Sequence, residues 1–390
     1  MTKSKVLFII GSLDSGGVSK SLVNTLNAID YSRYNVDLLV MSGSHGVFGQ
    51  YLPQDVRVII NNQICNALHG FKGIMAFIKD LKIRLAVMSV VRMILSLFNK
   101  ARSGYLLSRM FPSLDAKYDM IVDYNGQHQL YYMVDRLCGK KKVTFFHSDY
   151  EKWPYYKSMD KKYYTKVDAI FTISPQCVES LKRNFPEVAE KVQLFENISS
   201  PSVIIQMANE EIDETNWHGQ VLLTIGHIWK NKGIDLAIDA ARVLKQKRID
   251  FTWLFIGKIA EPKWLHVVNK YGLQDSMIFL GIKQNPYPYL KQCDIYVHPS
   301  RFEGKSIALD EAKILCKPIV VTNFSTVYDQ FENGLNATIC EMNGESLASG
   351  IELLIKDNAI ANKYVEYLIS QVKDNSSEIN KLLKHLNSNG

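Results

Sequence analysis

Short runs of apolar residues alternate with stretches of helical apolar spacing along the first 200 residues. The runs are rich in β-branched and aromatic side chains, which is typical of buried parallel strands separated by helices. They read KVLFIIGS, VDLLVMS, VRVII, DMIVDY, KVTFFHS and AIFTIS, and a helix is expected from about Ser19, after the first run. The pattern predicts a doubly wound α/β domain over residues 1–200.

The same alternation starts again at Val221, after a polar and acidic stretch, SSPSVIIQMANEEIDETN, that predicts an interdomain linker. The second set of predicted strands reads VLLTIGH, FTWLFIG, MIFLG, DIYVHPS, PIVVTN and ATIC, with helices between them. A second α/β domain is therefore expected over residues 215–372. The stretch from Asn358 to His385 has a helical pattern.

Composition fits two soluble domains. A chain of 390 residues exceeds what one core usually supports, and 47% hydrophobic residues suffice for two cores. The six cysteines are scattered without CxxC spacing, which indicates free thiols and a reducing cytoplasm. The first apolar run is too short for the core of a signal peptide, so we interpret it as a β-strand.

The most informative segment is HPSRFEGKSIALDEAKILCKP, residues 298–318, in which Glu303 and Glu311 stand eight positions apart. A buried strand from Ile295 to His298 leads into a turn that Gly304 permits, and a helix is expected to begin near Ser306. The amide groups at the start of this helix would face an anion beyond the carboxyl end of the strand, and Lys305 adds a positive charge there. One such pair of carboxylates, taken alone, is more often a solvated helix face.

This segment resembles the E-x7-E signature of retaining glycosyltransferase family 4, and the rest of the chain is similar to that family from end to end. The resemblance implies the GT-B fold, in which two Rossmann-like domains enclose the active site in an interdomain cleft. It also implies that a terminal helix, about residues 373–390, packs back onto the first domain. In the family the first Glu lies near the donor sugar and the second binds the ribose hydroxyls, roles that would fall to Glu303 and Glu311. Lys305-Ser306 replaces the Phe-Gly that most members have after Glu-Gly.

A second matching segment is LLTIGHIWKNKGIDLAIDAARVL, which resembles the family's G-R-x5-KG segment. Lys232 matches the family's Lys, and its ammonium would neutralise the β-phosphate as the sugar departs. His227 stands where the family commonly has Arg, and a neutral imidazole cannot fork two phosphate oxygens. Either Lys305 or Lys230 supplies the missing positive charge, or the donor binds in a different position. The alternative to a functional role for Lys232 is a solvated lysine on a loop.

Three further positions follow from the resemblance. The GSLDSGGVSKSL loop after the first strand implies a role for Gly17, where a backbone can approach a phosphate closely. His147 follows a buried strand, where the family often has a His near the donor sugar and the acceptor. The backbone groups of Ile282 and Lys283 are expected to lie near the nucleotide base. For each of the first two, a purely structural role stays open, as a sharp turn at Gly17 and as a packed imidazole at His147.

The chain contains no Asp-x-Asp, the carboxylate pair that holds a divalent metal in the other large glycosyltransferase fold. We therefore expect no metal cofactor. The phosphate charge would be met by Lys232, Lys305 and helix amides.

The net charge of +7 is unevenly distributed. Residues 72–110 contain eight basic side chains and one acidic one, Asp80, interleaved with the apolar stretches IMAFI and LAVMSVVRMILSLF. The longer stretch is short of the roughly 20 residues that span a bilayer. Two interpretations stay open: peripheral contact with anionic lipid headgroups, or an ordinary core helix with a basic edge. No nucleic-acid-binding module is recognisable.

The sequence thus predicts a cytoplasmic glycosyltransferase, peripheral at the inner face of the plasma membrane. It would move a sugar from a nucleotide sugar, UDP being the expected nucleotide, to a glycan or lipid-linked acceptor in cell-surface polysaccharide synthesis. Two alternatives remain: a GT-B sugar-nucleotide epimerase, and a catalytically silent partner that binds nucleotide or glycan.

Overall fold

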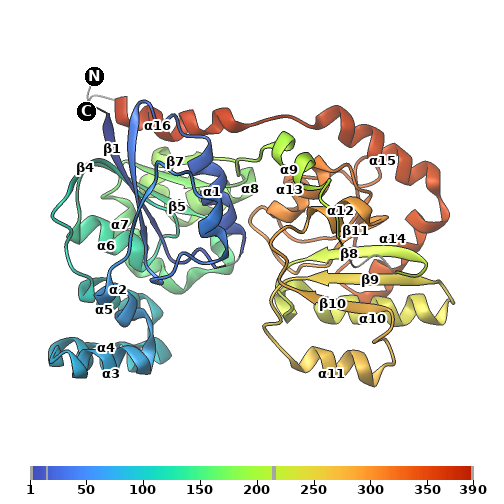
Figure 1. Ribbon diagram of the computed structural model, residues 1–390, viewed down its shortest axis with the longest axis horizontal. Helices are drawn as coiled ribbons and strands as arrows, with labels where there is room; N and C mark the ends of the chain where they lie inside the picture. The colour runs from blue at the N-terminus through green and yellow to red at the C-terminus, as the bar shows by residue number, and fades with distance from the viewer. Residues whose placement is uncertain (1–2, 15, 213–216, 388–390) are drawn as a thin grey trace. The chain divides into compact units, whose positions relative to one another are not determined.

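The computed structural model describes residues 3–14, 16–212 and 217–387, and it divides into two compact units. Unit 1 contains residues 1–198 and 376–390, and unit 2 contains residues 199–375 (Figure 1). Each unit has one parallel sheet covered by helices. The chain therefore has the GT-B architecture of two Rossmann-like domains.

Unit 1 is built on a seven-stranded sheet in the order β3-β2-β1-β4-β5-β6-β7, in which every pairing is parallel. The strands are β1 Ser4–Ile10, β2 Tyr34–Val40, β3 Arg57–Ile59, β4 Lys117–Asp123, β5 Cys138–Phe146, β6 Ala169–Thr172 and β7 Val192–Leu194. The helices are α1 Gly17–Asn27, α2 Asn62–Leu68, α3 Gly70–Lys79, α4 Ile83–Phe98, α5 Lys100–Met110, α6 His128–Arg136, α7 Lys157–Tyr164, α8 Pro175–Asn184 and α16 Ile379–Asn387.

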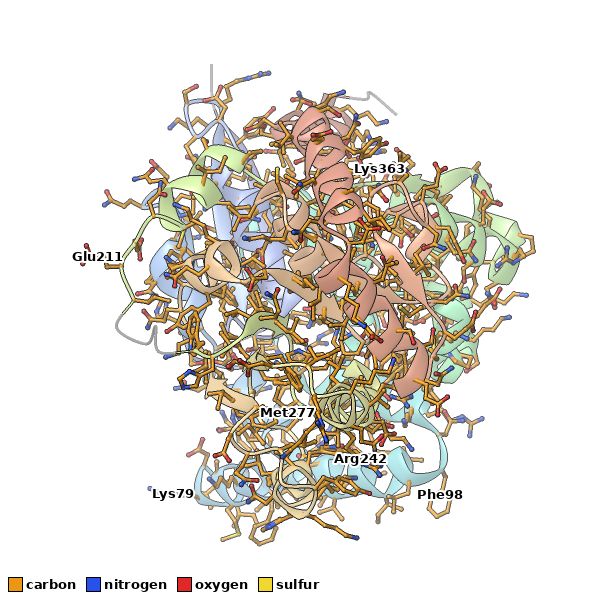
Figure 2. The ribbon with its side chains drawn as sticks, turned by 90° about the vertical axis from the view of Figure 1, so that its right-hand side faces the viewer. Lys79, Phe98, Glu211, Arg242, Met277 and Lys363 are labelled. Atoms are coloured by element: carbon orange, nitrogen blue, oxygen red, sulfur yellow. The ribbon has the colours of Figure 1, made fainter. Side chains whose placement is uncertain are left out.

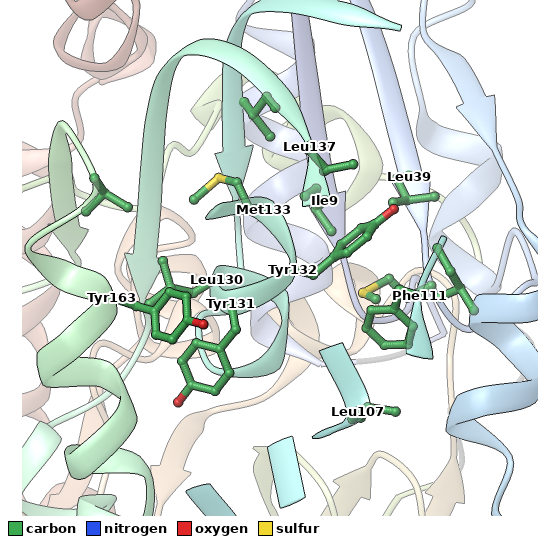
Figure 3. Packing of buried hydrophobic residues seen from close by; sticks show 14 of the residues in the cluster. Ile9, Leu39, Leu107, Phe111, Leu130, Tyr131, Tyr132, Met133, Leu137 and Tyr163 are labelled. Carbon is green, nitrogen blue, oxygen red and sulfur yellow. The ribbon is translucent and has the colours of Figure 1, made fainter. Parts of the chain in front are cut away.

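Two apolar cores lie on the two faces of this sheet. One core gathers around α6, where Leu130, Tyr131 and Met133 are fully buried and Tyr132 packs edge-on against Phe111 (Figure 3). The other core lies between the opposite face and α1, and it includes three residues of α16: Ile379, Leu382 and Leu383. The last helix is therefore part of unit 1 although it is far from it in sequence.

Unit 2 has a six-stranded parallel sheet in the order β10-β9-β8-β11-β12-β13. Its strands are β8 Gln220–Ile225, β9 Phe251–Ile256, β10 Met277–Gly281, β11 Ile295–His298, β12 Ile319–Thr322 and β13 Thr338–Cys340. Its helices are α9 Pro201–Met207, α10 Ile234–Gln246, α11 Lys263–Lys270, α12 Tyr287–Gln292, α13 Ile307–Ile314, α14 Gly344–Lys356 and α15 Asn358–Gln371.

Strand β7 matches none of the six predicted runs, and two helical segments also differ from the pattern expected from the sequence. Residues 201–207, within the predicted linker, form helix α9, because Ile204 and Ala208 bury apolar surface against Tyr287 and Ile314 of unit 2. The expected start of the second domain at residue 215 lies outside the described residues.

The second difference concerns the predicted helix from Asn358 to His385, which is two helices, α15 and α16. Between them the Asn375 side chain accepts a hydrogen bond from the backbone amide of Ser199, and Glu378 accepts one from that of Glu196. These contacts hold the connection between α15 and α16 against residues 196–199, where the chain passes from unit 2 back to unit 1.

Candidate active site

The carboxyl ends of β8 and β11 form the topological switch point of unit 2. The chain leaves β8 toward β9 on one side and later returns to β11 on the other side. Open parallel sheets bind ligands where the loops diverge in this way. The two loops that matter are therefore residues 226–233, after β8, and residues 299–306, after β11.

Gly233 brings these two loops into contact. Its backbone has φ of 72°, and a Cβ atom placed on it would lie 1.8 Å from the backbone oxygen of Pro299. Only glycine combines this left-handed conformation with so close an approach. The glycine that follows Lys232 is thus needed for packing as well as for the turn.

Arg301 also connects these two loops, through hydrogen bonds. Its guanidinium donates to both carboxylate oxygens of Asp235, at 2.7 and 2.8 Å, and to the backbone oxygen of Lys230 at 2.9 Å. Its backbone amide donates to the carbonyl of Asn231 at 2.9 Å. A forked Arg–carboxylate pair fixes geometry more strictly than a single contact does.

Glu303 is the centre of a buried polar cluster that these contacts create. Its side chain is 11% exposed, and its Oε1 atom accepts hydrogen bonds from Lys232 Nζ at 2.6 Å and from His298 Nε2 at 2.9 Å. The Thr326 hydroxyl donates to the backbone carbonyl of Glu303 at 2.9 Å. Lys232 is 31% exposed, and an ammonium has three donors, so the contact with Glu303 uses only one of them.

The electrostatics of the cluster favour an ionised Glu303 and a neutral His298. Burial alone would raise the pKa of Glu303, but the Lys232 ammonium and the His298 ring outweigh it and hold the pKa well below its usual range. Burial lowers the pKa of His298, so near neutral pH its Nε2–H donates to the carboxylate. The Tyr296 hydroxyl lies 3.3 Å from the other ring nitrogen. The hydrogen bonds of His298 and Lys232 therefore hold the Glu303 carboxylate in one position after β11.

Glu311 lies in α13 and is 2% exposed. The hydroxyl of Tyr287, at the start of α12, donates to its Oε1 atom at 2.9 Å. Helix α13 begins at Ile307 with Ser306 as its N-cap residue, which agrees with the start expected from the sequence. Gly304 and Ser306 are buried beside Lys305, so the turn before the helix is packed closely.

His227 lies on the loop after β8, and Ile282 and Lys283 lie on the loop after β10, at the same edge of the sheet. Burial lowers the pKa of His227, and the ammonium groups of Lys232 and Lys258 lower it further, so the ring is neutral near pH 7. Ile282 is exposed after β10, and the Lys283 ammonium lies 5.3 Å from the centre of the Tyr289 ring.

Gly17 and His147 belong to unit 1. Gly17 is exposed at the first position of α1, and the Ser19 hydroxyl donates to the carbonyl of Ser12 at 2.8 Å, which closes the loop after β1. His147 follows β5, which is separated from β1 by β4 in the same sheet. The positions of Gly17 and His147 are thus at the carboxyl edge of the unit 1 sheet.

The His147 ring is held by packing. Its centre lies 4.8 Å from that of the Tyr124 ring and 5.6 Å from that of Phe145. Burial lowers its pKa to about 4, although a hydrogen bond with the Tyr124 backbone acts in the opposite direction. Its Nε2 atom is buried and has no hydrogen-bond partner in the described chain. A buried imidazole nitrogen without a partner is unusual in a folded protein.

The two acidic residues near His147 make internal contacts. Asp149 is 1% exposed and accepts a hydrogen bond from Ser180 at 2.7 Å, and Glu151 pairs with Arg183 at 2.7 Å. A role for Asp149 and Glu151 in binding acceptor hydroxyls gains no support from these contacts.

The structure therefore joins Lys232 to Glu303 directly and places the other predicted residues on loops or helices that follow strands of the two sheets. Sequence reasoning missed His298, Arg301, Tyr287 and Gly233. Of these, only Gly233 could have been found from the sequence, because a glycine directly after a predicted phosphate-binding lysine indicates a close backbone approach. Within the residues that the structure describes, no group of three or more His, Cys, Asp or Glu side chains is placed to hold a metal ion.

Comparison with known proteins finds relatives of unit 2 and structural neighbours of the whole chain. Residues 208–371, nearly all of unit 2, match the family model of group 1 glycosyl transferases. Among curated proteins, one relative is the N-acetylgalactosamine-N,N'-diacetylbacillosaminyl-diphospho-undecaprenol 4-alpha-N-acetylgalactosaminyltransferase of Campylobacter jejuni, 26% identical over 204 residues. That match covers 52% of this chain and 54% of the relative, so the chain spans about half the length of this relative.

Two solved structures share the fold of the whole chain. A glycosyltransferase from Rickettsia africae aligns with a TM-score of 0.69 and 17% identity over 100% of both chains. HepE of Anabaena, in complex with UDP-glucose, aligns with a TM-score of 0.67 and 18% identity over 98% of both chains. Residues 208–371 of unit 2 are thus similar to group 1 glycosyl transferases, and the whole chain shares the fold of these two solved structures.

Proposed function

We propose that this chain is a retaining glycosyltransferase of family 4 that transfers a sugar from a UDP-sugar to a glycan or lipid-linked acceptor. The observation that carries the proposal is the buried contact between Lys232 and Glu303 at the switch point of unit 2. Such a site offers a fixed positive charge next to a fixed carboxylate. The positive charge is what departure of a nucleoside diphosphate from a sugar requires.

Lys232 would stabilise the charge that develops on the β-phosphate, with the two donors that Glu303 does not use. The amide groups at the start of α13 and the Lys305 ammonium would contribute further, so the reaction would proceed without a metal. Because the His227 ring is neutral, it would act as a hydrogen-bonding group and leave the charge to the lysines.

The carboxylates would bind the two ends of the donor. Glu303 would accept hydrogen bonds from the transferred sugar, and Glu311, held by Tyr287, would accept them from the ribose. On unit 1, Gly17 would face phosphate and the His147 Nε2 atom would meet a hydroxyl of the sugar or the acceptor. The backbone of Ile282 and Lys283 would contact the base.

The relatives suggest the chemical class of the substrates. UDP-glucose is bound in HepE, and the Campylobacter relative acts on a diphospho-undecaprenol-linked glycan. By analogy, we place the chain in cell-surface glycan synthesis, in the cytoplasm and at the inner face of the membrane that would contain a lipid-linked acceptor.

A panel of UDP-, GDP- and dTDP-sugars would test the donor site, scored by thermal stabilisation and by slow hydrolysis to free nucleotide. We expect one donor to stabilise the wild type, Lys232→Ala to lower hydrolysis by about 10²–10³-fold, and Glu311→Ala to weaken binding. Lys270→Ala, on an exposed face of α11, is the matched control and should behave as wild type. Binding without hydrolysis would indicate a silent partner, and absence of any binding would refute the donor site.

A further inference from the structure

Helices α3 and α4 carry apolar side chains on the side that faces solvent. They are joined by residues 80–82, pack against each other, and lie with α2 and α5 between them and the unit 1 sheet (Figure 1). Phe71 is 70% exposed, Leu97 79% and Phe98 83%, and Leu81 in the connection is 84% exposed. Phe98 and Lys79 point outward at the edge of the molecule (Figure 2).

Helix α4 has its faces reversed relative to an ordinary surface helix. Its packed face is narrow, with Ala86 and Ser89 buried and Arg92 partly buried. Its solvent face is a stripe at helical spacing in which all residues but Arg84 are apolar: Ile83, Val87, Val90, Val91, Met93, Ile94, Leu97 and Phe98. A surface helix normally puts polar side chains there. The interpretation of this segment as an ordinary core helix is therefore wrong.

Helix α3 continues the same apolar surface. Phe71, Met75 and Ile78, at positions i, i+4 and i+7, are all about half exposed or more. The two stripes together form what we call the α3–α4 face. Contiguous exposed apolar surface of this kind marks an interaction site in a soluble protein.

Positive charge surrounds this face. Lys72, Lys79, Lys82 and Arg84 are exposed on α3, the connection and the first turn of α4, and Lys100 and Arg102 follow α4. The first four make no ion pair with any residue that the structure describes. Asp80 is the one acidic residue between residues 70 and 110. The face is thus apolar in the middle and cationic at its edges.

We propose that the α3–α4 face docks onto an anionic lipid bilayer, with Leu97, Phe98 and their apolar neighbours inserted at the boundary of the headgroups and acyl chains. Helix α4 has 16 residues and so measures about 24 Å, less than the roughly 30 Å of a hydrocarbon core. No described helix is long and apolar enough to cross a membrane. The geometry is that of a helix lying in the interface.

Charge distinguishes a bilayer from a protein as the occupant. Protein interfaces are depleted in lysine, whereas lysine and arginine beside an apolar helix face are attracted to anionic headgroups. A second copy of the chain would bring two cationic rims together, which is unfavourable. Docking on a bilayer would bring the enzyme to a lipid-linked acceptor. This link to the acceptor rests on the proposed function.

The test is flotation of the full chain with vesicles of phosphatidylglycerol and phosphatidylethanolamine, compared with vesicles of phosphatidylcholine alone. We expect binding to the anionic vesicles only. Leu97→Ser/Phe98→Ser should reduce it at least tenfold. Replacement of Lys79, Lys82 and Arg84 by Gln should reduce it by about fivefold per charge.

Two matched controls on unit 2 remove equivalent groups elsewhere. Leu353→Ser/Ile369→Ser removes two exposed apolar side chains, and replacement of Lys270, Lys363 and Lys373 by Gln removes three exposed charges. Neither control should change vesicle binding. Melting temperatures of all variants should match the wild type, since the substituted side chains are exposed.

Three results would overturn the proposal: no binding to anionic vesicles, binding that both α3–α4 variants retain, or a dimer in vesicle-free solution that Leu97→Ser/Phe98→Ser dissociates. Donor hydrolysis, measured without vesicles, should be unchanged in every variant. Failure of docking and failure of the glycosyltransferase proposal are therefore seen in different assays.

Discussion

The contact between Lys232 and Glu303 makes a prediction that needs no substrate. We expect Lys232→Met, which keeps the apolar stem and removes the charge, to leave Glu303 buried with His298 as its remaining side-chain donor. Removing one partner of a buried, hydrogen-bonded group costs about 1–3 kcal/mol. The cost would be higher if the ion pair were fully buried. Because the Lys232 side chain is 31% exposed, water replaces part of the lost interaction with Glu303.

This loss of stability corresponds to a melting temperature lower by about 3–9 °C for a domain of this size. Tryptophan fluorescence is the suitable readout, because four of the five tryptophans, Trp217, Trp229, Trp253 and Trp264, lie in unit 2. Lys270→Met, on an exposed helix face, is the control and should leave the transition unchanged.

The difference should depend on pH in a defined direction. In the wild type the pKa of Glu303 is held below its unfolded value, so this carboxylate stabilises the fold above about pH 4 and loses that effect as the pH falls further. In Lys232→Met no ammonium group offsets the burial of Glu303, so the pKa of Glu303 rises. Protonation of Glu303 at lower pH therefore stabilises the variant. The gap between variant and wild type should therefore be widest at pH 7–8 and narrow toward pH 5.

A double-mutant cycle with Glu303→Gln completes the test. We expect a coupling free energy of about 1–3 kcal/mol between positions 232 and 303, because the two side chains touch. Equal stability of Lys232→Met and wild type at pH 7.5, or a cycle without coupling, would show that the ion pair does not form.

Three further predictions concern the loops and unit 1. Gly233→Ala should destabilise unit 2 by about 2–4 kcal/mol in a urea titration, because the added Cβ would lie 1.8 Å from a backbone oxygen, whereas Gly334→Ala, with φ of 77° and open space, should cost only about 1 kcal/mol; equal costs would contradict the close approach. Arg301→Lys should raise the KM for the donor several-fold and cost about 1–2 kcal/mol, since lysine cannot fork onto Asp235, and an unchanged KM would exclude a role in holding the loops. The pKa of His147 is about 4 in the folded chain and about 6.5 in the unfolded chain, so the neutral ring stabilises unit 1 above pH 6.5 and this stability is lost as the pH falls toward 4. His147→Gln should therefore flatten the decline in melting temperature over this pH range. An unchanged slope would contradict the burial of the ring.

The strands were predictable because buried parallel strands carry continuous apolar runs. The run from Ile295 to His298 is β11 with the same bounds, and the helix expected near Ser306 begins at Ile307. The repeated alternation also predicted two parallel sheets, which the structure confirms.

The contacts that assemble the site were not predictable from local pattern. Arg301 meets Asp235 across 66 positions of sequence, and the Lys232–Glu303 contact spans 71. Such pairs depend on the switch point, which brings together two strands, β8 and β11, whose loops are remote in the chain. A single sequence contains no local signal of that proximity.

The orientation of α4 was unpredictable for a different reason. An apolar stripe at helical spacing looks the same whether it faces a core or solvent, because the pattern states periodicity and not direction. Only the burial of Ser89, on the side of the helix away from the exposed Val87 and Ile94, shows which side is packed.

The most direct test of the central claim is proton NMR of a UDP-sugar incubated with the purified chain and water or a short glycan acceptor. The account predicts that the phosphate-linked anomeric signal decays, that the first product has the same anomeric configuration, and that Lys232→Ala slows the decay by about 10²–10³-fold. A donor signal that persists for every sugar tested, a product of inverted configuration, or conversion into an epimeric sugar nucleotide would contradict it.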